Sequence, residues 1–394
     1  MSTTSPWTPV RSADDFLVFG SPLIGEEEKR EVLESLESGW LGTGPKVKAF
    51  EEAFGAYVRA PHAIAVHSCT AALHLSLVTA GLEPDDQVIT TAMTFGATVN
   101  AIIHAGGTPV IADVEAEGFN IDLDDVEQRI TPRTRAIVPV HFAGRPCDME
   151  RLMAIAERHD LQVIEDCAHS IETRYRGRPM GSFGDAGCFS FYVTKNLATG
   201  EGGMITTADE ARAERLRRLA LHGLSRDAWD RFGRQGYKHY KVIECGFKYN
   251  MMDLQAALGV HQLARIEENW LRREEIWGIY QEAFRQLPVE TPRSPAPDTR
   301  HGYHLFTLLI DPDRAGITRD QFLEGMTAEN IGLGVHYESI PEHPYYRDTF
   351  GWKPEDYPVS HRIGRQTASL PFSAKLDDDD VADVISAVRK VLRA

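Results

Sequence analysis

The feature that most constrains the fold of this chain is a regular alternation of short apolar segments with helical patterns, from about residue 60 to residue 210. Seven segments have the length and β-branched composition of buried strands: AIAVHS (63–68), DQVITT (86–91), TPVIADV (108–114), RAIVPVHF (135–142), LQVIEDCA (161–168), AGCFSFY (186–192) and GGMITT (202–207). Helical stretches such as TAALHLSLVTAGL and DMERLMAIAERHD lie between them. Apolar strands that alternate with helices predict a mostly parallel sheet covered on both faces, and hence an α/β domain.

The pattern changes after residue 250. A long amphipathic stretch (253–287) and a Pro-rich loop (291–302) precede a region that predicts these elements: a strand at HLFTLLI (304–310), a helix from Ile317 with Thr318 as its cap, a strand at GVHY (334–337) and a final helix from Asp377. The four aspartates that open the final helix are typical of a helix N-terminus, where acidic residues are stabilising. We therefore expect a large domain over 1–260, including an N-terminal segment, and a smaller α+β domain over 261–394.

Composition excludes several classes of protein. The net charge of −16 is unfavourable for binding a nucleic-acid backbone. No apolar run reaches the roughly 18 residues of a membrane helix, and the first residues lack the pattern of a signal peptide. The five cysteines have no CxxC spacing, which argues against a zinc knuckle or a disulfide framework. We expect a soluble, cytoplasmic protein that binds neither nucleic acid nor membrane.

Polar residues follow several of the predicted strands, which is where open α/β sheets bind ligands. No GxGxxG or GxxxxGK[ST] pattern is present, so the usual nucleotide fingerprints are missing. After the first strand, His67-Ser68-Cys69-Thr70 leads into a helix whose free N–H groups would suit a phosphate. The alternative is an ordinary helix cap provided by Ser68 or Thr70.

The fifth and sixth strands end in ionisable side chains. Asp166, with His169 close behind it, is costly to bury unpaired, so it could face a cation, bind a metal or form a structural salt bridge. Lys195 lies between the strand that contains Ser190 and a glycine-rich turn. A sheltered lysine has a lowered pKa and can form an imine with an aldehyde, whereas a solvated loop lysine would do neither.

Together, a phosphate site, an aspartate and a lysine at neighbouring strand ends are what pyridoxal 5'-phosphate (PLP) requires. The aspartate keeps the ring nitrogen protonated, so that the ring accepts electrons, and the lysine holds the aldehyde.

The chain resembles the DegT/StrS family of PLP-dependent sugar aminotransferases over nearly its whole length. The resemblance is carried by SGWLGTGPKVKAFEEAF (38–54), SCTAALHLSL, VIEDCAHSI, GSFGDAGCFSFYVTKNLATGEGGMITT, GFKYNMMDLQAALGVHQL and LPFSAKL (370–376). It implies the type I PLP-dependent aminotransferase fold, in which a large domain with a mostly parallel sheet is followed by a smaller α+β C-terminal domain. It also implies a homodimer with shared active sites.

By this resemblance, Lys195 is the lysine that forms the imine with PLP and later moves the proton, and Asp166 faces the pyridine nitrogen. His169 stands in the place of a Gln or His that contacts the 3-hydroxyl of the ring, and Ser190 binds the phosphate.

Three further cofactor contacts follow from the same resemblance. Cys69-Thr70 stands where the family often has Gly-Thr, with backbone amides on the phosphate, although cysteine adds a Cβ. Phe95 occupies the position of a ring that stacks on the cofactor, the alternative being a core residue. Asn250 resembles the asparagine that the partner subunit contributes to the phosphate.

Substrate residues are implied by GVHYESIPEHPYY (334–346), which resembles the substrate side of the family site and implicates His336, Tyr337 and His343. Each of these could instead be a packed or surface residue. The stretches ITPRTRAIVPVHFAGRP and HGLSRDAWDR are similar to family members that act on the 4-keto pentose of a UDP-sugar in aminoarabinose synthesis.

The expected function is transfer of an amino group from L-glutamate to a keto group, 4-keto in the leading hypothesis, of a nucleotide-linked sugar. Lys195 favours this over the sugar dehydratases of the family, which carry His at that position. Four alternatives stay open: transamination of other ketones or aldehydes, PLP-dependent dehydration, a silent regulator that binds PLP or a sugar nucleotide, and a metal enzyme built on Asp166 and His169.

Overall fold

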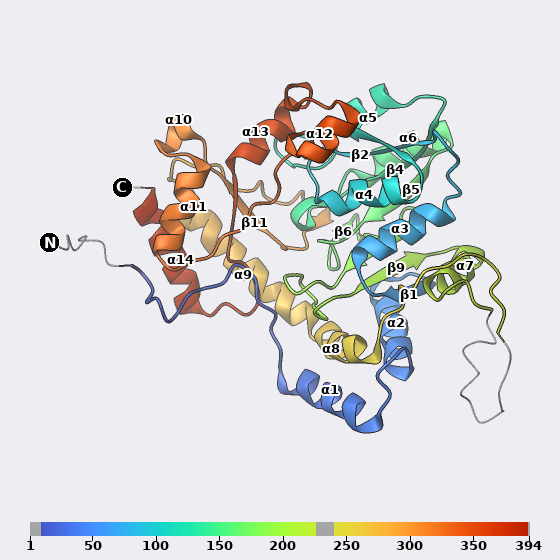
Figure 1. The fold of residues 1–394 in the computed structure, drawn as a ribbon. Coiled ribbons are helices and arrows are strands. Elements are labelled where there is room, and N and C mark those ends of the chain that lie inside the picture. Colours follow the sequence, from blue (N-terminus) through green and yellow to red (C-terminus); the bar gives the residue numbers. More distant parts are fainter. Residues whose placement is uncertain (1–8, 226–239, 393–394) are drawn as a thin grey trace.

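The structure is a computed structural model that describes residues 9–225 and 240–392 (Figure 1). Its helices are α1 (Glu26–Ser38), α2 (Pro45–Val58), α3 (Cys69–Thr79), α4 (Gly96–His104), α5 (Leu123–Arg129), α6 (Met149–His159), α7 (Glu210–Ala220), α8 (Asp253–Ala264), α9 (Ile266–Phe284), α10 (Pro312–Ala315), α11 (Arg319–Ala328), α12 (Pro344–Phe350), α13 (Pro358–Gln366) and α14 (Asp378–Val391). Its strands are β1 (His62–Val66), β2 (Gln87–Thr91), β3 (Thr108–Ala112), β4 (Thr134–Val138), β5 (Gln162–Asp166), β6 (Arg174–Tyr175), β7 (Arg178–Pro179), β8 (Ala186–Ser190), β9 (Gly203–Thr207), β10 (Thr299–Arg300), β11 (Phe306–Leu309) and β12 (Thr367–Leu370).

All seven predicted strands of the first half join one sheet, in the order β1-β9-β8-β5-β4-β2-β3. Strand β9 is antiparallel to both of its neighbours, and the other pairs are parallel. Alternate strand residues face two separate cores: Ile64 and Val66 pack with α3, α4 and α7, whereas Ala63 and Ala65 pack with α2, α5, α6 and α8. The predicted sheet with helices on both faces is therefore confirmed.

The helices pack against the same two cores. In α6 the buried residues Met149, Leu152, Ile155 and Ala156 recur every three or four positions and form one apolar stripe. Among the described residues, no helix is long and apolar enough to cross a membrane.

A further core lies in the C-terminal part of the chain, where α9, α11 and α14 pack around the antiparallel pair β11 and β12. The predicted caps are present: the Thr318 hydroxyl accepts a hydrogen bond from the Gln321 N–H at 3.2 Å, and Asp377 accepts one from the Asp380 N–H at 2.8 Å. The four aspartates therefore begin a helix. The domain boundary after residue 260 stays a prediction; that position lies inside α8.

One predicted strand is wrong. Residues 334–337 form a single backbone bridge, between Gly334 and Ser369, and not a strand. Bonds that involve side chains stand where the backbone bonds of a strand pair would be. His336 Nδ1 is hydrogen-bonded to the Ser369 hydroxyl at 2.9 Å, and the His336 carbonyl accepts from the Thr367 hydroxyl at 3.1 Å. At the next residue the segment contacts the large-sheet region, where the Tyr337 N–H lies 3.4 Å from Met93 Sδ.

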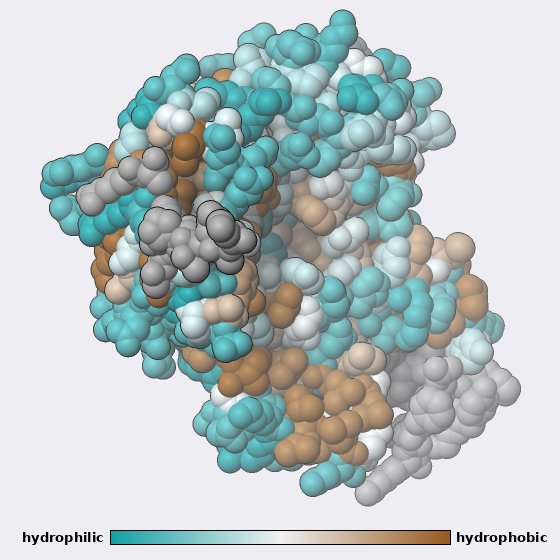
Figure 2. Space-filling view, turned by 60° about the vertical axis from the view of Figure 1, so that its left-hand side comes forward, coloured by the Kyte–Doolittle hydropathy of each residue, from teal (hydrophilic) through white to brown (hydrophobic). Residues whose placement is uncertain are grey.

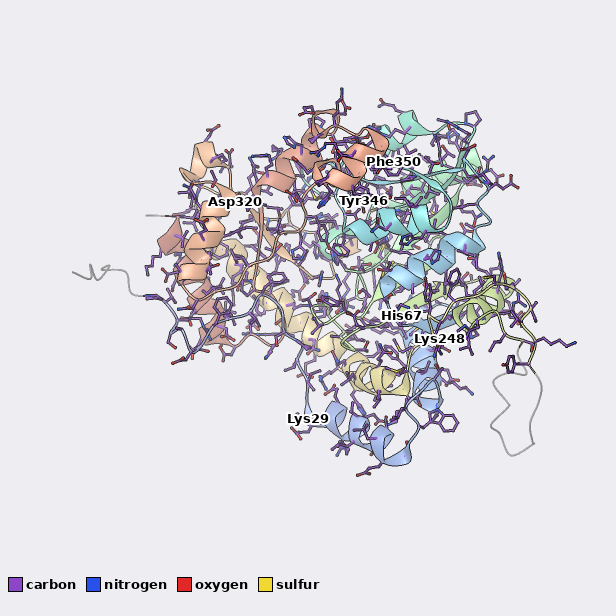
Figure 3. The ribbon with its side chains drawn as sticks, in the orientation of Figure 1. Lys29, His67, Lys248, Asp320, Tyr346 and Phe350 are labelled. Atoms are coloured by element: carbon purple, nitrogen blue, oxygen red, sulfur yellow. The ribbon has the colours of Figure 1, made fainter. Side chains whose placement is uncertain are left out.

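Helix α12 also packs back onto the large sheet's helices, and Figure 3 shows Tyr346 and Phe350 on it, next to α4. The Tyr346 hydroxyl is hydrogen-bonded to Asn100 Oδ1 at 2.8 Å. C-terminal residues therefore cover α4, whose first turn begins at the end of β2.

Candidate active site

The carboxyl ends of β1, β2, β4, β5 and β8 lie at one edge of the sheet because these strands run in the same direction. This edge brings together Asp166, His169, Ser190, Lys195 and the start of α3, as the sequence predicts. The roles of these residues stay predictions, and their geometry is as follows.

Asp166 is the last residue of β5 and is 4% exposed. Its Oδ1 accepts a hydrogen bond from the Ala168 N–H at 3.1 Å, and its Oδ2 accepts one from the Thr98 hydroxyl at 2.9 Å. Burial raises the pKa of Asp166, and these two bonds together with the charge of Lys195 act against that rise. Because Thr98 donates to Asp166, the 2.7 Å bond between Thr94 and Thr98 must be donated by Thr94.

His169 is buried three residues further along and has a fixed tautomer. Its Nδ1 accepts a hydrogen bond from the Ala143 N–H at 3.2 Å, so the proton of the neutral ring is on Nε2. Nε2 lies 3.0 Å from the Tyr337 hydroxyl. Burial, reinforced by the positive charge of Lys195, lowers the pKa of His169 well below its usual value. The ring is therefore a neutral hydrogen-bond donor.

Lys195 lies in the loop after β8, where its backbone N–H donates to the Tyr192 carbonyl at 2.8 Å. Burial lowers the pKa of Lys195 to about 8, against the opposing influence of Cys69 and Asp166. The amine is thus sheltered and not a solvated loop lysine. With this pKa, about a tenth of the amine is unprotonated at pH 7, far more than for a lysine with the usual pKa of 10.5, and the unprotonated form is the nucleophile.

The start of α3 offers unpaired N–H groups. Ser68 caps the helix by accepting from the Ala71 N–H at 3.1 Å, which leaves the N–H groups of Cys69 and Thr70 without an intrahelical partner. The capping and phosphate-binding interpretations of this segment are therefore compatible. The Cys69 thiol lies 3.5 Å from the Cys188 carbonyl, on the sheet side.

Ser190 lies beside this helix start because of a close approach at Gly203, its partner across β8 and β9. A Cβ at residue 203 would lie 2.7 Å from the Cys69 nitrogen and 2.5 Å from the Ser68 carbonyl carbon, so only glycine fits. Ser190 is thus paired with the residue that touches the start of α3, and a hydroxyl close to the N–H groups there would suit a phosphate.

Phe95 and Asn250 complete the predicted cofactor residues. Phe95 immediately precedes α4 and is 64% exposed, so it is not a core residue; its ring lies 6.1 Å from that of Tyr337. Asn250 bridges to Val66 at the end of β1, and its Nδ2 donates to the Thr43 hydroxyl at 2.6 Å.

The three predicted substrate residues separate into two groups. Tyr337 contacts His169, and partial burial together with the positive charge of Lys195 lowers the pKa of the half-buried His336 to about 3. His343 lies apart from them at the start of α12, where it contacts Glu338 at 3.9 Å and the Tyr346 ring at 6.1 Å.

Three residues of the site were missed from the sequence: Thr98, Asn196 and His304. Thr98 could have been predicted from the sequence. A helix that begins just after a strand places the hydroxyls of its first turn at the carboxyl edge of the sheet, beside Asp166. Asn196 and His304 bond to one another at 3.0 Å across 108 residues of sequence, and no local pattern predicts such a contact.

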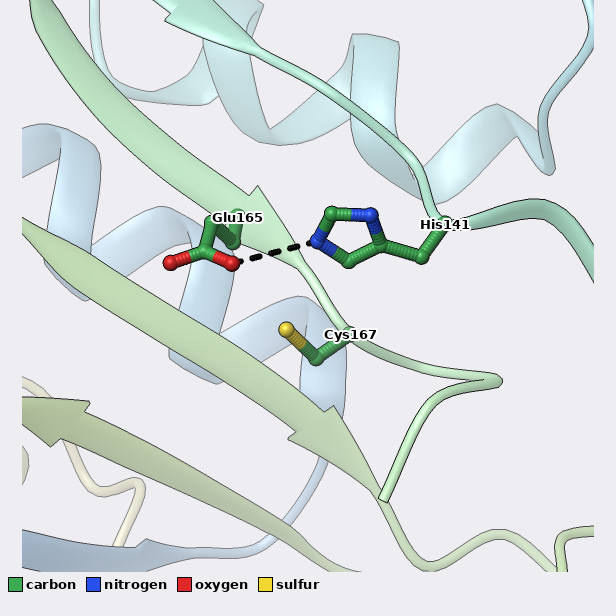
Figure 4. A group of neighbouring side chains, drawn as sticks. All are labelled: His141, Glu165 and Cys167. Carbon is green, nitrogen blue, oxygen red and sulfur yellow. Dashed lines mark hydrogen bonds and ion pairs between the residues drawn. The ribbon is translucent and has the colours of Figure 1, made fainter. Parts of the chain in front are cut away.

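A metal-like group, His141, Glu165 and Cys167, lies nearby in the described structure (Figure 4). Glu165 is committed to the backbone, because it accepts the N–H groups of Gly181, Phe183 and Gly184, each at 2.8 Å. His141 Nδ1 accepts the Cys147 N–H at 3.2 Å, so Nε2 carries the proton directed at Glu165, 3.2 Å away. Glu165 and His141 are therefore already engaged in hydrogen bonds that hold the loop at 181–184 in place.

PLP fits the observed residues. The N–H groups of Cys69 and Thr70, which have no partner within α3, suit its phosphate. Asp166 supplies a carboxylate for its ring nitrogen, and Lys195 supplies a sheltered amine for its aldehyde. This donor set defines a site for a phosphorylated aldehyde.

Comparison with known proteins identifies the class. Residues 22–389 match the model of the DegT/DnrJ/EryC1/StrS aminotransferase family. The chain is 50% identical over 385 residues to the spore coat polysaccharide biosynthesis protein SpsC of Bacillus subtilis, covering 98% of this chain and 99% of SpsC.

Solved structures agree. Spr1654 of Streptococcus pneumoniae in its PMP form has a TM-score of 0.89 and 31% identity, covering 96% of this chain and 98% of that one; it is also known in a PLP form. PseC of Helicobacter pylori, an aminotransferase of pseudoaminic acid biosynthesis, has a TM-score of 0.89 and 28% identity, covering 96% of this chain and all of PseC (100%).

The fold and the family are therefore those of a PLP-dependent transaminase. The chain belongs to the DegT/DnrJ/EryC1/StrS family of sugar aminotransferases.

Proposed function

We propose that this transaminase transfers the amino group of L-glutamate to the keto group, at carbon 4, of a nucleotide-linked sugar. The observation that carries the proposal is the sheltered amine of Lys195, with a pKa of about 8, at the same sheet edge as Asp166. The names of SpsC and PseC, which refer to polysaccharide and pseudoaminic acid biosynthesis, support a sugar acceptor. The finer resemblance to enzymes of UDP-aminoarabinose synthesis stays a prediction, and part of one of its stretches (226–231) lies outside the described residues.

Each residue has a chemical task in this proposal. When bound, PLP supplies an electron sink for the carbon that loses a proton. Lys195 holds the cofactor and then, as a free amine, moves that proton. Asp166 keeps a proton on the ring nitrogen, and Thr98 fixes the carboxylate that does so. The Nε2–H of His169, which meets the Tyr337 hydroxyl in this structure, would turn to the 3-hydroxyl of the bound ring, and Tyr337 and His336 would then contact the substrate.

We also propose a homodimer with shared sites. Large exposed apolar residues gather around α1 and the segment after it, and they include Leu33 (57% exposed), Leu36 (52%), Trp40 (54%), Leu41 (42%) and, beside Asn250, Met252 (44%). Figure 2 shows a continuous apolar area at the bottom of the molecule, the height at which Figure 1 places α1. A patch of this kind marks an interaction surface. Asn250 contacts Thr43 in this region, which is where a residue donated to a partner would lie.

A mixing experiment tests the shared site. The variants Lys195→Ala and Asn250→Asp should each be inactive, the second because a carboxylate would repel the phosphate, but their mixture should regain activity, because one site of the mixed dimer would contain both native residues. A mixture that stays inactive after subunit exchange would contradict the shared site. Trp40→Glu should give monomers in sedimentation, whereas Tyr345→Glu, equally exposed (56%) but on α12, should not.

The five free cysteines agree with a reducing compartment, and we propose the cytoplasm as the location.

The function itself is tested by the visible spectrum of the PLP-loaded protein. L-Glutamate should convert the yellow band of lysine-bound PLP to the band of pyridoxamine phosphate, and a 4-keto sugar nucleotide should restore the yellow band with formation of an amino sugar. Loss of water from the sugar would instead support a dehydratase. A band that ignores every amino donor would support a silent regulator.

A further inference from the structure

The residue after Lys195, Asn196, has its side chain fully committed. Its Nδ2 donates to Glu172 Oε2 at 2.9 Å and to the Gly302 carbonyl at 2.8 Å. Both partners can only accept, so both amide hydrogens are used and Oδ1 is the remaining acceptor. The group 3.0 Å from Oδ1 is His304 Nδ1, which must therefore carry a proton.

His304 is consequently a neutral imidazole with a known tautomer. It is 5% exposed, and burial, reinforced by the positive charge of Lys195, lowers its pKa well below the usual value. The proton is on Nδ1, so Nε2 is bare. The ring also contacts the ring of His169, with 4.3 Å between centroids and 36° between planes.

Two further contacts hold His304 in place. The backbone N–H of His304 donates to the Ala143 carbonyl at 3.1 Å, and the backbone N–H of Gly302 donates to the Gly144 carbonyl at 2.7 Å. A Cβ at Gly144 would lie 2.9 Å from the Gly302 Cα, so this approach requires glycine. The Ala143 N–H is the group that fixes His169. The segment that carries His304 is thus joined to the loop that orients His169.

The far end of the network is a buried ion pair. Glu172 (0% exposed) bonds through Oε1 to Arg273 of α9 (2% exposed), and through Oε2 to Asn196. An ion pair this deeply buried resists rearrangement, because separating it would strand two charges. Asn196 is therefore anchored from Glu172 on one side and from His304 on the other.

We propose that His304 is a positioning residue for Lys195 and His169. Its Nδ1–H bond to Asn196 fixes the loop that carries Lys195, and its ring fixes the plane of the His169 ring. The proposal rests on the proposed transaminase function. It assigns to a C-terminal segment the task of aligning two residues of the large sheet.

Two substitutions separate the two contacts of His304. His304→Phe keeps a ring against His169 but leaves Asn196 Oδ1 unpaired. His304→Asn keeps a donor in the place of Nδ1 and removes the ring. His301→Phe is the matched control, because His301 is also buried (3% exposed) in the same segment but contacts Trp277 and Tyr303.

The measurements are the pH titration of the absorbance of lysine-bound PLP, the Kd for PLP, kcat and KM for L-glutamate, and the melting temperature without cofactor. For His304→Phe we expect a shifted titration midpoint and a kcat lowered about tenfold or more at unchanged KM, since a buried acceptor is left unsatisfied. For His304→Asn we expect a native midpoint with weaker PLP binding. His301→Phe should change the melting temperature alone.

The proposal is overturned if His304→Phe behaves like His301→Phe, with native midpoint and kcat, or if His304→Asn fails to restore the midpoint in a folded protein. Failure of the proposed function would be seen separately, as wild-type protein that binds PLP but transfers no amine.

Discussion

The site is built by two regions that differ in how they are made. One is the edge of the large sheet, where Asp166, Ser190 and Lys195 lie at or just after strand ends. The other is the pair of C-terminal segments that return to this edge and bring His304 and Tyr337 against His169. In the first region, strand direction sets where the side chains lie, because the carboxyl ends of parallel strands share one edge. The second region depends on packing between distant parts of the chain, and we propose that it aligns Lys195 and His169.

Replacing the lysine of the first region should have the largest effect. Lys195→Ala removes both the covalent hold on PLP and the group that moves the proton, so kcat should fall by at least about a thousandfold. Steady-state transamination and the loss of the yellow band measure this. Lys48→Ala is the control, because Lys48 is exposed on α2 and contacts Glu52 at 3.8 Å. A Lys195→Ala variant with substantial turnover would refute the assignment.

Lys195 also predicts a pH dependence. Only the unprotonated amine captures the aldehyde of PLP, and burial lowers the lysine pKa from its usual 10.5 to about 8. The rate of covalent capture by the cofactor-free protein should therefore rise with pH and level off above about pH 8, as followed by stopped-flow absorbance. A rate still rising steeply at pH 10 would mean that the amine is solvated.

Asp166 should rank next. Asp166→Asn keeps a side chain of the same shape for the Thr98 hydroxyl but loses the charge that holds a proton on the ring nitrogen. We expect kcat to fall by about a hundredfold or more with little change in melting temperature. Single-turnover kinetics with L-glutamate measure the step directly. A nearly neutral variant would show that this strand end has a structural role.

The first region could be predicted from the sequence because its signals are local. Apolar segments give the strands, parallel strands share one carboxyl edge, and polar residues directly after them must meet there. Ser68, Asp166 and Lys195 follow from that rule alone. The glycine-rich turn after Lys195 is also predicted, but the close approach of Gly203 to Ser68 and Cys69 is not.

The second region could not be predicted in this way, because its contacts join residues far apart in sequence. Tyr337 contacts His169, which is 168 residues away in the sequence. Its segment is predicted to be a strand, but in the structure it is an irregular segment held by bonds to Thr367 and Ser369. The motif resemblance named Tyr337 and His336, but it also named His343, which lies with Glu338 and Tyr346. The substrate roles of all three residues stay predictions.

Tyr337→Phe tests the second region with a smaller expected effect. It removes the hydroxyl 3.0 Å from His169 Nε2 and keeps the ring, so kcat should fall roughly tenfold. Tyr346→Phe is the matched control, because its hydroxyl bonds to Asn100 on α4 and should affect stability and not turnover. Equal kinetic effects of the two variants would mean that the C-terminal segments act only as packing.

The smallest effects should come from the phosphate end, where the backbone and not the side chain is the main ligand. Cys69→Ala keeps the N–H at the start of α3 and loses only a weak thiol contact with Cys188, so the Kd for PLP should stay within about twofold of the native value. Ser190→Ala removes a hydroxyl beside the same N–H groups and should raise that Kd about fivefold. Fluorescence titration of the cofactor-free variants with PLP measures both. If Cys69→Ala weakened PLP more than Ser190→Ala did, the thiol would be a ligand in its own right, and the backbone account of this end of the site would be wrong.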